Sequence, residues 1–471
     1  TFAVEKSNYQ NMDFRKCKAA GTAAAVFLSL LLPAGAGMSS VSGRNAGEGI
    51  ENGHGAQGDT LRLTLPEIFS RIENGNRTMA MLRSAKEASE EGIQAAKNAR
   101  LPELNAELNV SYIGDAFLTD RNFSNCTKAP SPHFGNGFTL EAQQVVYAGG
   151  AVNAGVRIAE SQAGLASAQI DKSRQGLRLM AAGQCIDLFR IDNDIKVYKE
   201  NISLTERLIA EIQAKREQGL ALANDVTRYE LRLEMLKLEL VRMENNSTVL
   251  NYRLCNTLGL PEGTVITPAL SEPEDMRADS HSSWQDRAEQ TSPELKIADV
   301  NADIAVAQRQ IVRSGRLPKV AVVAHENFNG PITFEIPPID KNLNIWYVGL
   351  GIRYEFGSLY KSGHKLRQAT IAVRQAEQAR DVSKENLQND VQQAFADYRQ
   401  AYVELETREK SLQLADENYE RVHDRYIEQL VLVTDMLDAF NMKLDAELGV
   451  ADAEAEIEYR LCRLKYAAGV L

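Results

Sequence analysis

An internal repeat is the feature that most constrains how this chain can fold. GNRTMAMLRSAKEASEEGIQAAKNARLPEL (75–104) aligns without gaps on TSPELKIADVNADIAVAQRQIVRSGRLPKV (291–320), and both segments carry Arg-Leu-Pro near their end. EQGLALANDV (217–226) has a counterpart in EQLVLVTDML (428–437). A sequence that resembles itself over such a distance predicts one structural unit used twice.

Both halves show the same order of predicted elements: short helix, Leu-Pro break, strand, loop, strand, long helix, break and helix. We expect a first repeat at 61–260, with strands at about 104–115 and 137–147 and a long helical hairpin at 151–258. A linker at 261–285 precedes a second repeat at 286–471, with strands at about 319–328 and 343–356 and a hairpin at 360–469.

The helical segments carry coiled-coil spacing. After the first break, apolar residues follow alternating steps of three and four, beginning with Val226, Tyr229, Leu233, Leu236 and Leu240. The long helix that precedes them would span roughly 100 Å at 1.5 Å per residue. Two shorter helices, at about 77–100 and 224–258, together have nearly that length. We therefore expect them to stack end to end along the long helix.

The first 36 residues have the composition of an export signal. A basic segment at 15–18 precedes an apolar run from Ala23 to Leu32 and the small residues Ala34-Gly35-Ala36. Residues 1–36 are therefore predicted to be an upstream segment and secretory signal peptide, and 37–60 an N-terminal linker. No later apolar run reaches 18 residues, so no transmembrane helix is predicted.

Charge and motifs exclude several function classes. The net charge is −11 and no basic stripe occurs, which argues against a nucleic-acid partner. The chain lacks the common hydrolase, metalloprotease and nucleotide-binding motifs, and its six histidines are dispersed. We therefore predict no enzyme activity, catalytic residue, metal site or cofactor. Cys185 and Cys255 lie equally far from Leu220 in sequence, so a disulfide is possible, although two buried thiols are favoured.

The strands alternate in the manner of a sheet with one apolar face. In LNAELNVSY (104–112) apolar and polar residues alternate, and WYVGLGIRY (346–354) places an aromatic residue, Trp346, at the edge of its apolar row. Strands of about ten residues in an exported chain fit an outer-membrane barrel. Four strands cannot close such a barrel alone. The chain must pair them with another sheet or contribute them to a barrel shared by several copies.

With these features the sequence resembles the TolC-like outer-membrane factor family over about residues 60–471. The resemblance depends on LTLPEIF at the start, the Leu-Pro breaks, VYAGG after the second strand, SPEL in the second half, and GLALANDV and VTDMLDA at the helix breaks. It implies a mainly α fold with a small membrane β-barrel: a homotrimer with a twelve-stranded barrel above a long coiled-coil tunnel. It places the chain in the outer membrane of a Gram-negative bacterium, in contact with lipid, with the helical tunnel in the periplasm.

In that family the helix breaks form the periplasmic tips, which dock a periplasmic adaptor through a Val-Gly-Leu type motif. Gly219 and Leu220 match it, whereas Gln429 and Leu430 stand at the second break, with Gln429 where glycine is expected. Gly219 also fits an ordinary helix C-cap, and both roles are compatible.

The resemblance further implies a gate. Asp435 and Asp438 match aspartates that form rings narrowing the tunnel, and Asp225 and Tyr426 match a pair that helps hold the coils closed. Val431 replaces the arginine that joins this lock, so the lock is expected to be weaker or completed by another residue. By spacing alone, helix-end roles are favoured, with the aspartates offsetting the macrodipole and Asn224 as a cap.

The function implied is a passive exit duct of a tripartite efflux pump or type I secretion system, powered by an inner-membrane pump of the RND, ABC or MFS type. The alternative from another class is a soluble periplasmic coiled-coil scaffold or adaptor. A scaffold has no need of the alternating strands, and a barrel needs detergent for extraction.

Overall fold

The structure, a computed structural model, describes residues 60–270, 280–336, 338–428 and 430–471. The predicted signal peptide at 1–36 and almost all of the linker at 37–60 lie outside the described residues, as does Gln429. Within the described ranges, no helix combines the length and apolar character needed to cross a bilayer.

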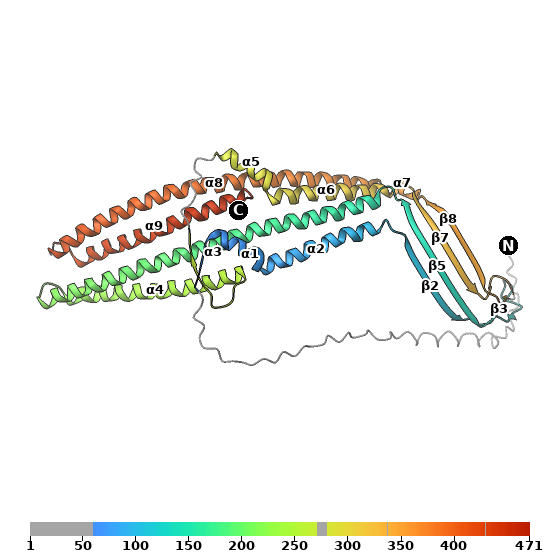
Figure 1. The fold of residues 1–471 in the computed structure, drawn as a ribbon, viewed down its shortest axis with the longest axis horizontal. Helices are drawn as coiled ribbons and strands as arrows, with labels where there is room; N and C mark the ends of the chain where they lie inside the picture. The colour runs from blue at the N-terminus through green and yellow to red at the C-terminus, as the bar shows by residue number, and fades with distance from the viewer. Residues whose placement is uncertain (1–59, 271–279, 337, 429) are drawn as a thin grey trace, which may run out of the picture. The chain divides into compact units, whose positions relative to one another are not determined.

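Long helices account for most of the fold, as predicted (Figure 1). The helices are α1 (Leu65–Gly75), α2 (Arg77–Asn98), α3 (Ala151–Glu217), α4 (Ala223–Leu258), α5 (His281–Thr291), α6 (Pro293–Ser314), α7 (Gly357–Lys361), α8 (Gly363–Ile427) and α9 (Val433–Ala467). The strands are β1 (Thr60–Leu63), β2 (Glu103–Tyr112), β3 (Ala116–Leu118), β4 (Thr127–Ala129), β5 (Phe134–Tyr147), β6 (Val265–Pro268), β7 (Lys319–Gly330) and β8 (Leu343–Arg353).

Local sequence sets where α2 and α6, the helices before the first strand of each half, begin and end. The Asn76 side chain accepts hydrogen bonds from the backbone N–H groups of Thr78 (2.8 Å) and Met79 (3.3 Å), which caps α2. The Ser292 hydroxyl caps α6, and Pro293 occupies its first position. Each of these helices stops before a Leu-Pro pair, because the residue preceding proline is disfavoured in the helical conformation.

The four longer strands form one antiparallel sheet in the order β2-β5-β7-β8. Its register places apolar residues on one face, as in the row Leu104–Ala142–Ala324–Val348. Many side chains of this face are exposed, among them Leu108 at 76% and Trp346 at 71%. Polar and small residues dominate the opposite face, as in the row Asn105–Glu141–His325–Tyr347.

The helices pack lengthwise in two layers of contacts. Near the sheet the order of neighbours is α2, α3, α6, α8, and toward the helix breaks it is α4, α3, α9, α8. The two shorter helices α2 and α4 therefore follow each other along α3, as their lengths predicted. In both layers α3 has a neighbouring helix on each side, whereas α8 lies at one edge of the layer.

Some elements differ from the sequence-based expectation. The long helix expected from residue 360 begins at Gly363, because Ser362 separates it from the short helix α7 and accepts a hydrogen bond from Arg316 Nε (2.6 Å). The strand expected to reach residue 115 ends at Tyr112, and the Asp115 carboxylate instead forms an ion pair with Lys128 (2.5 Å). Beyond it, the expected loop contains the small hairpin β3-β4.

The segment expected to be a linker also contains structure. β6 pairs in parallel with β1, so the beginning of the first repeat lies next to the residues that follow its last helix. Cys185 and Cys255 belong to the core beside this pair and form no disulfide. Burial raises the pKa of the Cys185 thiol to about 12, so this group stays protonated at neutral pH.

Candidate functional site

The first helix break is a glycine-dependent helix end. Gly219 has φ +73°, in the left-handed region, and its N–H donates to the Arg216 carbonyl (2.9 Å). The Leu220 N–H donates to the Lys215 carbonyl (2.9 Å), which completes a Schellman motif. The helix end that the sequence suggested for Gly219 is therefore present. Three residues lead from there into α4, with Leu220 and Leu222 exposed and Ala221 half-buried against the core.

The second break repeats this geometry where it is described. The Leu430 N–H donates to the Arg425 carbonyl (2.9 Å), the same bond as that from Leu220 to Lys215. Gln429 itself lies outside the described residues. The two breaks lie at the same ends of the two hairpins (Figure 1). Residues of both breaks line one cavity.

Each break has an aspartate whose side chain hydrogen-bonds to the backbone at the N-terminus of the next helix. The Asp225 carboxylate accepts a hydrogen bond from the Leu222 N–H (3.0 Å), and the Asp435 carboxylate accepts one from the Leu432 N–H (3.2 Å). An acidic side chain in a first turn also interacts favourably with the helix dipole. The suggestion that Asn224 caps α4 was wrong, because Leu222 occupies the N-cap position.

Asp435 and Asp438 are both exposed and lie three residues apart in the first turns of α9. Residues at this spacing share a side of a helix, so the two carboxylates present negative charge to the same region. The next residues along α9 that are fully buried, Met436, Ala439 and Phe440, face the core instead.

A cavity of about 320 Å³ lies between the two breaks and brings the predicted pair, Asp225 and Tyr426, together. Its wall also contains Lys215, Arg228 and Val431. Burial raises the pKa of the Tyr426 hydroxyl, and the charges of Asp225 and Glu211 add to the shift. Within the described residues no hydrogen bond joins Asp225 to Tyr426. The structure therefore gives proximity of the pair without the bond that the resemblance implied.

Four leucines are exposed at the breaks: Leu220, Leu222, Leu430 and Leu432. Leu222 and Leu432, which the sequence-based analysis did not single out, are the N-cap residues of α4 and α9, and each is 70% exposed. The sequence contained a sign of this surface, because each break has two leucines separated by a single residue. A paired apolar surface at the break is unusual for a solvent-exposed turn.

Above the breaks, a core unites all four helices of the two hairpins. It contains Tyr229 of α4, Tyr419 of α8 and Phe440 of α9. Beside this core, Asn201 of α3 donates to Glu447 of α9 (2.9 Å), and Lys443 pairs with Asp416 of α8 (2.8 Å). Apolar packing and the Asn201–Glu447 hydrogen bond thus join the two hairpins of one chain, whereas the Lys443–Asp416 ion pair lies within the second hairpin.

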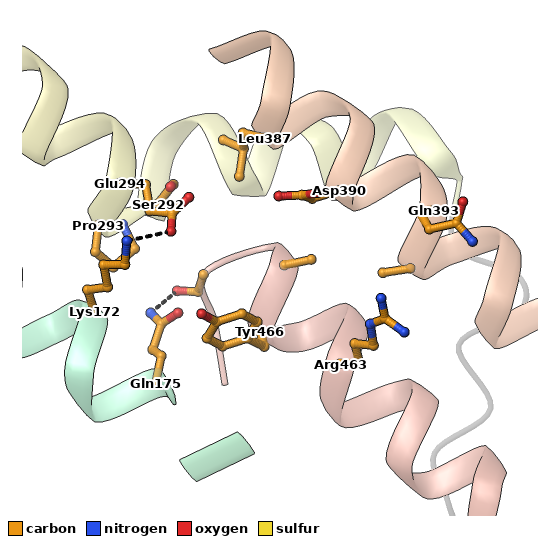
Figure 2. A pocket seen from close by; sticks show the side chains of 13 residues that line it. Lys172, Gln175, Ser292, Pro293, Glu294, Leu387, Asp390, Gln393, Arg463 and Tyr466 are labelled. Atoms are coloured by element: carbon orange, nitrogen blue, oxygen red, sulfur yellow. Dashed lines mark hydrogen bonds and ion pairs between the residues drawn. The ribbon is translucent and has the colours of Figure 1, made fainter. Parts of the chain in front are cut away.

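A second cavity, of about 270 Å³, lies where α3, α6, α8 and α9 meet (Figure 2). Lys172 forms an ion pair with Glu294 (2.9 Å), and Gln175 donates to the Gly469 carbonyl (2.8 Å). These contacts join elements far apart in sequence, which indicates a packing role. In the described part of the chain, no group of three or more His, Cys, Asp or Glu residues is arranged to hold a metal ion.

The fold is shared with solved outer-membrane channels. The structure matches the outer-membrane channel OprN with a TM-score of 0.70 at 15% identity, covering 86% of this chain and 90% of that one. It matches CusC, described in terms of transmembrane channel formation, with a TM-score of 0.74 at 13% identity over 89% and 95% of the two chains. The open state of the Neisseria gonorrhoeae MtrE outer membrane channel matches with a TM-score of 0.67 at 16% identity over 86% and 88%. The fold is thus that of this class of channel.

The family model described as outer membrane efflux protein matches residues 68–260 and 284–470. The chain belongs to this outer membrane efflux protein family. No curated protein matches the sequence.

Proposed function

We propose that this protein is the outer-membrane exit duct of a tripartite efflux pump or a type I secretion system. The proposal depends on one observation: the sheet and the two helix layers have their edge elements on the same two sides of the protein. β2 and β8 end the sheet, α2 and α8 end the adjoining helix layer, and α4 and α8 end the layer at the breaks. Edges on opposite sides that differ from each other suit a head-to-tail ring.

A ring of three copies would both pair the free edge strands of the sheet and let lipid cover its exposed apolar face. Each edge strand would pair with the opposite edge of the next copy, giving a closed twelve-stranded barrel without free backbone groups in lipid. The exposed apolar face would then contact outer-membrane lipid. In a soluble periplasmic scaffold this face would remain in water. Such exposure is unfavourable for a contiguous apolar surface that includes Leu108, Val110, Leu350 and Ile352.

The helix layers would continue this ring as a tunnel in the periplasm of a Gram-negative bacterium. Asp435 and Asp438, repeated in three copies near a common axis, would narrow the path and favour cations. Asp225 and Tyr426 would help hold the tips closed. Energy for transport would come from an inner-membrane pump, and the duct itself would be passive.

The exposed leucines support docking of a partner at the tips. Gly219 shapes the first tip, and Leu220 and Leu430 present apolar side chains at the first and second tip. Gln429, which the resemblance assigns to the same docking role, lies outside the described residues. We infer that a periplasmic adaptor binds here and favours the open arrangement of the coils. A ligand can shift such an equilibrium only by binding the open state more tightly.

The gate is tested with paired substitutions that separate charge from helix capping. Asp435→Asn with Asp438→Asn keeps an oxygen that can accept the Leu432 N–H, whereas Asp435→Ala with Asp438→Ala removes it. Both double variants should lower the cation preference of single channels in planar bilayers severalfold, because both remove the charge. Asp424→Asn, which removes one carboxylate at the exposed end of α8, provides a control for loss of negative charge elsewhere near the breaks. Unchanged selectivity in both double variants would remove these aspartates from the gate.

A further inference from the structure

The cavity between the breaks is lined by basic side chains to which the resemblance assigned no role. Val431 stands where an arginine is expected, so α8 and α9 offer no cation at that position. Lys215 and Arg228 line the same cavity, and both belong to the first hairpin. A cationic group therefore faces the second hairpin from the opposite side.

Lys215 makes a direct contact across the cavity. Its Nζ lies 4.8 Å from the centroid of the Tyr426 ring, within the range of a cation–π interaction. Lys215 belongs to the last turn of α3 and Tyr426 to the last turn of α8, so the contact joins the two hairpins beside their breaks. The Lys215 carbonyl is held by the Leu220 N–H, which fixes the backbone from which the side chain extends.

The surroundings favour the ring of Tyr426 over its hydroxyl as the interacting group. The Asp225 carboxylate, the acceptor expected for that hydroxyl, accepts from the Leu222 N–H. Burial and nearby carboxylates keep the Tyr426 hydroxyl protonated by raising its pKa, so the ring remains neutral. A neutral aromatic ring that is partly removed from water is a suitable partner for an ammonium group.

We propose that Lys215 is a further gate residue, which holds the two hairpin tips of one protomer together through the face of the Tyr426 ring. The inference rests on the proposed gated duct and adds the contact that takes the place of the missing arginine. It differs from a hydrogen-bonded lock in one respect that experiment can separate: the tyrosine hydroxyl is dispensable, whereas the ring and the lysine charge are required.

The test compares four substitutions with one control. Tyr426→Leu and Lys215→Met remove the ring or the charge, whereas Tyr426→Phe and Lys215→Arg preserve the contact. The control is Arg216→Met, which removes the neighbouring cation of the same helix turn. Loss of a cation–π contact should raise the ratio of open to closed tips roughly 5- to 30-fold per protomer. Single-channel conductance reports opening, and spin labels at Gln218 and Glu428 in a Cys126→Ser background report the distance between the tips.

The proposal expects wider label distances and larger conductance for Tyr426→Leu and Lys215→Met, with the two conservative variants and Arg216→Met like the parent. Opening by Tyr426→Phe equal to that by Tyr426→Leu would overturn it in favour of a hydroxyl lock. Equal opening by Lys215→Met and Arg216→Met would overturn it in favour of a general charge effect at the helix end, and a Lys215→Met variant that stays closed like the parent would also overturn it. The label distances are read without conductance, so failure of the parent protein to conduct would count against the duct and leave this test intact.

Discussion

At the scale of single residues, two buried tyrosines differ in the hydrogen bonding of their hydroxyls, so removing each hydroxyl should change stability in opposite directions. Tyr229 of α4 is 1% exposed, and its hydroxyl lacks a hydrogen-bond partner among the described residues. The Tyr398 hydroxyl, equally buried, lies 3.2 Å from that of Tyr402. A buried polar group without a partner costs about 1–3 kcal/mol, whereas a satisfied one contributes about 1 kcal/mol.

Tyr229→Phe should therefore stabilise the folded protein by about 1 kcal/mol, and Tyr398→Phe should destabilise it by a similar amount. The midpoints of thermal unfolding, followed by circular dichroism, measure both. Because each substitution removes the same atom, the pair controls for the change in volume. Equal loss of stability in both would show that the Tyr229 hydroxyl is satisfied in solution.

At the scale of elements, the packing of α3 against α9 contains a carboxyl group with a shifted pKa. Burial raises the pKa of Asp194 to about 6, Asp452 of α9 adds to the shift, and Arg190 opposes it. Because the folded-state pKa lies above the ordinary value of 3.8, folding favours the protonated acid. As the pH rises from about 4 through 6, Asp194 therefore destabilises the folded protein progressively. Above that range the full destabilisation remains.

Asp194→Asn should consequently stabilise the protein at pH 7.5 by about 1 kcal/mol, after allowance for partial solvent screening, and by roughly a third of that at pH 4.5. Unfolding midpoints across this range measure the difference. Asp187→Asn supplies the control, because Asp187 pairs with Arg190 (3.1 Å) and its removal should bring no gain at higher pH. A gain independent of pH would rule out titration of Asp194 as the cause.

The same scale shows what sequence could and could not predict. Heptad spacing and Leu-Pro breaks are local signals, and they indicated the long helices and the four longer strands near their observed positions. The pairing of β1 with β6 depends on residues far apart in sequence, and the extreme shortness of these strands leaves little periodicity to detect. The Lys215–Tyr426 contact likewise arises only when the two hairpins pack side by side.

At the scale of the whole molecule, the lateral faces carry apolar residues without a partner in one chain. Leu231, Met235, Leu238 and Val241 form an exposed stripe along α4. In a ring of three copies this stripe would pack against α8 of the next copy. Exposed apolar stripes of this kind mark interfaces more often than solvated surfaces.

Leu238→Glu should therefore lower the fraction of trimer in detergent, measured by native mass spectrometry. Met442→Glu, an equivalent change at an exposed position on α9, should leave assembly intact, because α9 lies between α3 and α8 in its own chain. Retention of the trimer by the Leu238 variant would place the interface elsewhere.

The most direct test of the shared barrel combines the mass of the detergent-extracted protein with its single-channel conductance in planar bilayers. The account predicts a trimer with small, cation-selective conductance, as expected for a continuous path that is narrowed at its tips. A water-soluble monomer without conductance would contradict the duct and favour the periplasmic scaffold.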